Sequence, residues 1–120
     1  MKIVRILNST KNNVVCEKCL VADNFWTRGK GLLGRKGLPA DEGILLSPGS
    51  SIHMFGMKFA IDVVFLTKDD TVTDFVENIA PGKAHIAKDG GFGKPFAALE
   101  IVAGQIKQVE LSIGDKLKRE

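Results

Sequence analysis

The stretch that decides the fold of this chain is residues 51–66, which read SIHMFGMKFAIDVVFL. From Met57 onward every second side chain is apolar, and this alternation predicts a β-strand over 57–66 with one buried face. Asp62 lies on the other face between apolar neighbours. Because an unpaired buried charge is too costly to keep, we expect Asp62 to be paired, hydrogen-bonded or protonated. Asp62 is therefore either a structural anchor or part of a site.

The rest of the chain shows short apolar segments separated by turn residues. These patterns predict strands at 2–7, 14–22 and 43–47, a hairpin of 57–66 with 71–77, and a second hairpin of 98–103 with 106–113 around Gly104-Gln105. A short helix is expected to begin at Asp23 or Asn24 and to run through Leu33. The predicted fold class is mainly β, or β-rich α+β: a compact barrel-like or sandwich domain of short antiparallel strands with one short helix, spanning 1–120 as a single domain.

Composition sets bounds on the partners of this chain. Its 120 residues are 44% hydrophobic and 26% charged, as in ordinary soluble domains, and the net charge is +3. Part of the basic excess lies in residues 116–120, which we expect to be a solvated end. Nucleic acid is not favoured as a partner, because no basic stripe alternates with aromatic residues. No run reaches the ~20 apolar residues of a membrane helix, so we expect a cytoplasmic protein without membrane contact. The oligomeric state stays open.

Residues 80–96 fit no secondary-structure period and are expected to form a partly mobile flap that carries His85. Within this segment, Gly90-Gly91-Phe92-Gly93-Lys94 resembles a phosphate-binding loop. However, Lys88 replaces the first glycine of that motif, and Pro95 stands where Ser or Thr would bind magnesium. A flexible loop is the better interpretation, and we expect no cofactor.

Glu100 repeats the situation of Asp62, since it lies between Ala98 and Val102 on a strand whose other face is apolar. Two such carboxylates, with His53 just before the strand of one of them, would suit acid–base chemistry with raised carboxyl pKa values. The alternative is that each acid pairs with a cation such as Arg28, Arg35 or Lys58 and holds strands in place. Met54 and Met57 would fill gaps in the core, although with His53 they also resemble soft metal ligands.

The two cysteines form the sequence Cys16-Glu17-Lys18-Cys19. In a regular strand, side chains three residues apart point to opposite faces, which makes a disulfide between them awkward. A zinc site would need two further ligands, for example His53 and His85, and a redox motif would need a helix N-terminus at the first cysteine. Ordinary structural thiols are the favoured interpretation, and no metal site is predicted.

Several of these segments together resemble the domain of unknown function 192 family of small bacterial and archaeal proteins. The matching pieces are residues 27–35, 43–46 and 52–66, then Leu99-Glu100 with Ala103-Gly104, and finally Gly114-Asp115. The resemblance implies a compact β-rich domain with no established biochemical activity. It points to a set of polar and methionine positions as candidate ligand-binding residues: Arg28, Arg35, His53, Met57, Asp62 and Glu100. The cysteines lie outside the pattern.

The leading hypothesis is an uncharacterised cytoplasmic protein that acts as a small-ligand-binding or accessory module rather than an enzyme. Its polar pocket would lie around the His53–Asp62 segment, beside Glu100 and the two arginines, and residues 80–97 would partly cover it. Arginines beside carboxylates would orient a small polar or anionic ligand. One alternative is a small hydrolase-like enzyme that uses Asp62 or Glu100 with His53. The other is a metal or thiol site at Cys16 and Cys19.

Overall fold

The computed structural model describes residues 2–24 and 31–120 of the chain. The described part consists mostly of strands, with one short helix. The strands are β1 (Lys2–Asn8), β2 (Asn13–Ala22), β3 (Glu42–Leu46), β4 (Ser51–His53), β5 (Ile61–Leu66), β6 (Val72–Ile79), β7 (Ala84–Ile86), β8 (Ala97–Val102) and β9 (Leu117–Arg119), and the helix is α2 (Gln105–Gln108). Among the described residues, no helix is long and apolar enough to cross a membrane.

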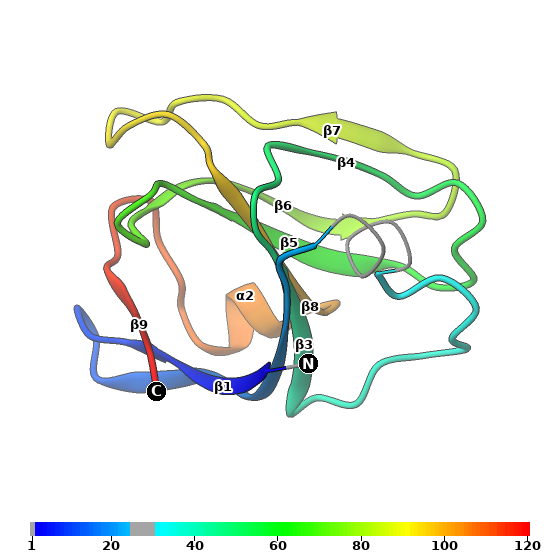
Figure 1. The fold of residues 1–120 in the computed structure, drawn as a ribbon, viewed down its shortest axis with the longest axis horizontal. Helices are drawn as coiled ribbons and strands as arrows, with labels where there is room; N and C mark the ends of the chain where they lie inside the picture. Colours follow the sequence, from blue (N-terminus) through cyan, green and yellow to red (C-terminus); the bar gives the residue numbers. More distant parts are fainter. Residues whose placement is uncertain (1, 25–30) are drawn as a thin grey trace.

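The main sheet has seven strands in the order β6-β5-β8-β3-β2-β1-β9. All of its neighbouring strands are antiparallel except β2 and β3, which run parallel. The sheet curls into a half-barrel, and α2 lies inside the curve (Figure 1). Strands β4 and β7 form a separate two-stranded sheet. The predicted fold class is therefore confirmed.

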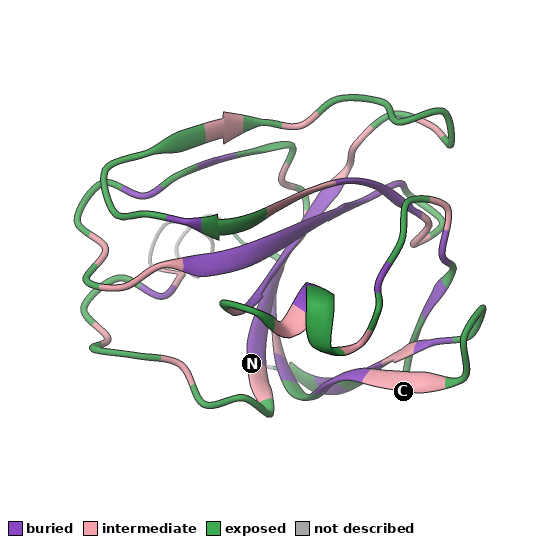
Figure 2. Ribbon diagram, turned by 180° about the vertical axis from the view of Figure 1, so that it is seen from behind, coloured by how far each residue is buried: buried purple, intermediate pink, exposed green. Residues whose placement is uncertain are grey.

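Both faces of the central strands of the main sheet are covered. One cluster of buried side chains joins the inner face to α2 and includes Val64, Leu99 and Ile106. A second cluster lies on the other face under β4 and includes Ile52, Val63 and Phe65. All six residues of β5 are buried, which explains the deep purple of the central strands in Figure 2. Successive side chains of β5 therefore point into two different hydrophobic clusters, and neither face of this strand is exposed to solvent.

The predicted hairpin of β5 and β6 is confirmed, but its first strand, β5, is shorter than the predicted strand over 57–66. Strand β5 begins at Ile61, because residues 54–60 form turns that carry the chain from the small sheet to the main sheet. Gly56 has a φ of 80°, a conformation that interrupts any strand. Most of the helix predicted from Asp23 lies outside the described residues, and residues 31–34 form turns.

The second predicted hairpin is wrong. Strand β8 is present, but the chain continues into α2 instead of a return strand. Gly104 has a φ of 94°, and the backbone N–H groups of Gly104 and Ile106 both donate to Asp62 Oδ2, at 3.1 and 3.0 Å. A carboxylate from β5 thus holds the first turn of this helix, and the apolar spacing of residues 106–113 serves a helical turn and a loop.

The charged residues at the C-terminal end are exposed, as predicted, but part of this end forms an edge strand. Strand β9 pairs with β1, and Leu117 is buried. The guanidinium of Arg119 donates to both carboxylate oxygens of Asp70, at 2.9 and 2.8 Å. The sequence did not predict this strand because its partner lies at the other end of the chain, and local charge patterning gives no signal for such a pairing.

Residues 80–96 are held in place at several points and do not form the predicted flap. Strand β7 pairs with β4, and His85 Nε2 lies 2.9 Å from Asp74 Oδ2, with its ring stacked on Phe65. The glycine run does not form a free anion nest, since the Asp89 carboxylate accepts hydrogen bonds from the N–H groups of Gly91 and Gly93. These amides are already used within the loop, which removes the phosphate interpretation.

Candidate functional site

Asp62 is a structural anchor. Its side chain is completely buried, and both carboxylate oxygens are occupied by backbone donors. Oδ1 accepts from the N–H of Asn78 at 2.8 Å, and Oδ2 accepts from Gly104 and Ile106. Three backbone N–H groups offset the cost of burying the charge, and they join β5 to β6 and to α2. Of the two roles that the sequence left open, the structure assigns the structural one.

Glu100 lies on the opposite face of the sheet from Asp62. In the pairing of β5 with β8, Val63 lies opposite Glu100, whereas Asp62 lies opposite Ile101. Residues directly opposite one another share a face, and successive residues alternate, so the two carboxyl groups point to different sides of the sheet. The predicted acid–base group of Asp62 and Glu100 is therefore not formed, because a packed sheet separates them.

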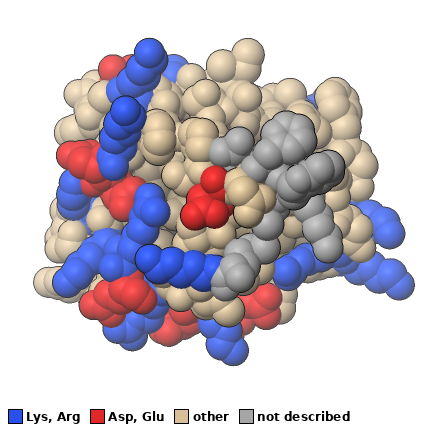
Figure 3. Space-filling model, in the orientation of Figure 1, with Lys and Arg blue, Asp and Glu red and all other residues tan. Residues whose placement is uncertain are grey.

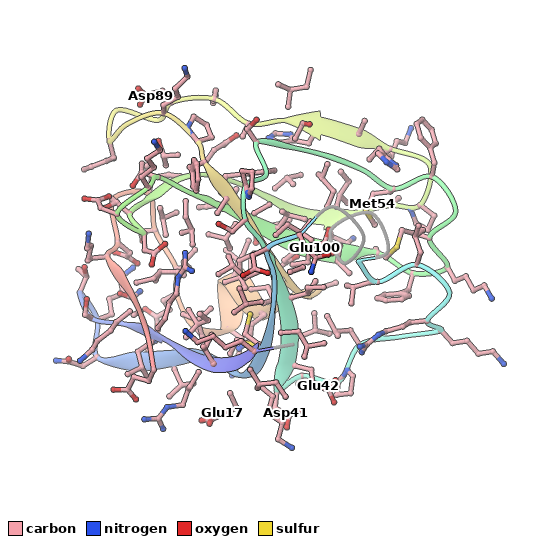
Figure 4. The ribbon with its side chains drawn as sticks, viewed as in Figure 1. Glu17, Asp41, Glu42, Met54, Asp89 and Glu100 are labelled. Carbon is pink, nitrogen blue, oxygen red and sulfur yellow. The ribbon has the colours of Figure 1, made fainter. Side chains whose placement is uncertain are left out.

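A small cavity lies over Glu100. Its volume is about 130 Å³, and its described lining comes from residues 31–33, Leu46, β4, Met54, Met57 and Glu100. Three of the predicted ligand-binding residues, His53, Met57 and Glu100, thus meet at one cavity. Figure 4 shows Glu100 on the central part of the sheet, far from Glu17, Asp41 and Glu42, which gather at the lower edge.

Strand β4 supplies the polar side of this cavity. Its residues Ser51, Ile52 and His53 all contribute to the lining, and Ser51 and His53 are exposed residues at the mouth. The sequence analysis did not single out Ser51. Ser51 lies two residues before His53, and residues at this spacing share one side of a strand, so the spacing could have indicated it.

The Glu100 carboxyl group is buried without a partner. The residue is 6% exposed, and no described group donates a hydrogen bond to it or forms an ion pair with it. Burial alone raises the pKa of Glu100 to about 7, because removal from water disfavours the charged form. An unpaired acid on a central strand has no structural task of the kind that Asp62 performs, and it is available to a ligand that enters the cavity.

The remaining predicted site residues do not contribute described groups to the cavity. Arg35 Nη1 lies 3.4 Å from Glu42 Oε1, so this arginine is directed to the start of β3 rather than to Glu100. Arg28 lies outside the described residues. The expectation that residues 80–97 cover the pocket is also wrong, since no residue of that segment belongs to the described lining. The cavity is bordered instead by β4 and residues 31–33.

The two cysteines lie on the same face of β2, contrary to the expectation from regular strand geometry. Val4 lies opposite Cys19 and Ile6 lies opposite Cys16, so Arg5 alone faces two residues of β2. This β-bulge shifts the alternation by one residue and brings both thiols into one core cluster, where both are buried and free. Each thiol donates to a backbone carbonyl, Cys16 to Asp41 and Cys19 to Leu20, with 3.7 Å between sulfur and oxygen in both cases. The neighbouring Cys19 thiol lowers the pKa of Cys16, whereas the Cys16 thiol and burial raise the pKa of Cys19.

No group of three His, Cys, Asp or Glu side chains that could hold a metal ion occurs within residues 2–24 and 31–120. The cysteine pair thus has no third described ligand of these types. On the face shown in Figure 3, basic side chains are intermixed with acidic ones along the left and lower parts of the molecule. The cavity over Glu100 and the thiol pair are two features of the described structure that place polar or reactive groups in a buried setting.

Comparison with solved structures shows the same fold in bacterial proteins. A protein of unknown function from Novosphingobium aromaticivorans DSM 12444 matches with a TM-score of 0.79 and 23% identity, over 97% of this chain and 83% of that chain. A protein from Sinorhizobium meliloti 1021, provisionally described as a transcription regulator, matches with a TM-score of 0.80 and 23% identity, over 98% of this chain and 92% of that chain. At this level of identity the likeness shows the fold alone.

Comparison of sequences finds archaeal relatives. A UPF0127 protein from Pyrococcus abyssi (strain GE5 / Orsay) is 30% identical, over 94% of this chain and 95% of the relative. A UPF0127 protein from Thermococcus sibiricus is 28% identical, over 93% of this chain and 72% of the relative. The sequence model of DUF192, described as "Uncharacterized ACR", matches residues 6–119. With nearly its whole length covered, and with the motif residues in the expected order, this chain belongs to the DUF192 family.

Proposed function

We propose that this protein is a small-ligand-binding module and that its ligand enters the cavity over Glu100. The observation that supports this proposal is a nine-tenths buried carboxyl group without a partner, placed at the wall of a cavity on a central strand. A buried polar group normally has a hydrogen-bond partner, and a group that lacks one is a candidate for contact with a ligand. His53 and Ser51 at the mouth supply further polar contacts, while Leu32, Met54 and other apolar side chains exclude water.

A thermal-shift screen across metabolite classes tests this proposal. A ligand present at about ten times its Kd stabilises the folded state by about 1.4 kcal/mol, which for a chain of this length raises Tm by about 5 °C. The shift should disappear in Glu100→Gln and persist in Glu77→Gln, a variant at an exposed position of β6. Shifts are compared within each variant, because Glu100→Gln changes the starting Tm. No response in any class, or shifts that Glu100→Gln retains, would contradict the proposal.

A second candidate function is a thiol redox site at Cys16 and Cys19. The observation that favours it is the β-bulge, which places both thiols on one face, where each shifts the pKa of the other. The two thiols would join in one disulfide by giving two electrons and two protons to an oxidant such as diamide, which becomes a hydrazine. The pair lies in the core, so the reaction requires local opening of the β1–β2 end of the sheet.

Trypsin cleavage gives a direct readout for this thiol chemistry, because Lys18 lies between the two cysteines. After treatment of the folded protein with diamide, we expect the two tryptic peptides to stay linked until a reductant is added. Cys16→Ser provides the control that cannot form the link. Two thiols that remain fully open to alkylation after unfolding would show that the pair is an ordinary part of the core.

A further inference from the structure

The cavity over Glu100 has a charge pattern that selects its ligand. Among the described residues that line it there is no Lys or Arg, and the ionisable side chains are Glu100 and His53. Across the neighbouring strands, the residues opposite Glu100 are Val63 of β5 and Ile44 of β3, both apolar and buried. Among the described residues, the Glu100 carboxylate therefore has no cation beside it at this cavity, and its charge would repel an anionic ligand.

The shape of the lining adds a second requirement. Leu32, Leu33 and Ile52 contribute hydrocarbon, and Met54 and Met57 contribute thioether side chains that adapt to the outline of a ligand. The volume within this lining is about 130 Å³, and the cavity is partly open to solvent. The enclosed part of the cavity thus suits a short hydrocarbon chain with one polar end.

We propose that the ligand of this cavity is a short aliphatic amine, bound as its ammonium ion with the cation at Glu100 and the hydrocarbon chain against Leu32, Met54 and Met57. This inference rests on the proposed function and names the chemical class of its ligand. An ammonium group donates up to three hydrogen bonds, and its positive charge supplies the partner that the Glu100 carboxylate lacks. Charge-assisted hydrogen bonds are about twice as strong as neutral ones, so the amine gains over an alcohol of the same length.

The test compares three compounds with the same four-carbon chain: butylamine, 1-butanol and butyrate. Binding is followed at pH 8 by amide chemical shifts of the isotope-labelled protein, where butylamine is cationic and butyrate is anionic. We expect butylamine to bind at least about tenfold more tightly than 1-butanol, and butyrate to bind most weakly. Glu100→Gln should remove the preference for the amine, whereas Glu77→Gln should retain it. The shifted amides should include those of β4 and β8.

The outcomes separate this inference from the proposed function. If 1-butanol or butyrate binds the cavity as well as butylamine, in both the native protein and Glu100→Gln, the cation preference is wrong while the cavity remains a binding site. If none of the three compounds binds, the inference is also wrong, and the thermal-shift screen then decides whether a ligand of another class occupies the cavity. If butylamine shifts only amides far from β4 and β8, the cation site lies elsewhere and the inference fails.

Discussion

Glu100→Gln is expected to raise the free energy of unfolding at pH 8 by about 3 kcal/mol. The pKa of Glu100 is raised from 4.5 to about 7 by burial, and each unit of such a shift corresponds to about 1.4 kcal/mol. Because the folded pKa lies above the unfolded one, the folded state binds more protons between pH 4.5 and 7. The native protein is therefore most stable, with respect to this group, below pH 4.5, and it loses that stability as the pH rises to about 7.

Urea unfolding of the native protein and of Glu100→Gln at several pH values checks this prediction. The difference between them should be below about 1 kcal/mol at pH 5 and should reach its full size at pH 8. Glu77→Gln, at an exposed position of β6, should show a difference near zero at both pH values. A Glu100→Gln variant that is less stable than the native protein at pH 8 would mean that the carboxylate has a stabilising partner.

Asp62→Asn is expected to lower the free energy of unfolding by about 3 kcal/mol, the opposite sign to Glu100→Gln. An asparagine amide keeps one acceptor oxygen and replaces the other with an NH2 group that only donates. Either the N–H of Asn78 or the N–H groups of Gly104 and Ile106 then lose their acceptor. A backbone donor near the core that is left without a partner costs about 1–3 kcal/mol.

Two measurements define the Asp62→Asn experiment. Urea unfolding gives the loss of stability, and hydrogen exchange of the Ile106 amide should become faster, since that N–H lies in the buried first turn of α2. The matched control is Asp23→Asn, because Asp23 is exposed. A loss below about 1 kcal/mol with unchanged exchange at Ile106 would show that the carboxylate does not hold the helix.

The two substitutions are expected to change the free energy of unfolding in opposite directions, because Asp62 stabilises the fold and the burial of Glu100 destabilises it. From the sequence, Asp62 and Glu100 looked alike, because each interrupts an apolar strand. What separates them is the register between β5 and β8, which turns Glu100 toward the cavity and Asp62 toward α2. The register is the pairing of residues between two strands that lie far apart in the sequence, and the periodicity within one strand does not reveal it.

The parts of the fold that the sequence predicted are those with local causes. The β5–β6 hairpin has adjacent strands joined by turn residues, and β1 with β2 forms a second pair of this kind. The errors share a different cause. Helix α2 depends on a carboxylate more than forty residues earlier in the chain, and the shared face of Cys16 and Cys19 depends on a bulge opposite Arg5. In both cases a partner strand overrides the local pattern.

Part of the candidate site could be predicted from local sequence, and part could not. His53, Met57 and Glu100 were chosen because polar or adaptable side chains occur among apolar neighbours, and this signal is visible in the sequence alone. The arginines were expected at the site through family resemblance. Arg35 instead lies beside Glu42, seven residues along the chain, and the family resemblance gave no sign of this ion pair.

The place of β9 in the sheet has a consequence for how the chain acquires its structure. Asn8 and Asp115 are 107 residues apart in sequence, and their side chains meet at 2.8 Å where β9 closes the edge of β1. During synthesis on a ribosome, the outer edge of β1 stays unpaired until residues 117–119 have emerged and can dock on it. Such long-range closure makes folding slow compared with that of helical proteins of similar size, and it leaves a transient edge that chaperones or other nascent chains can reach.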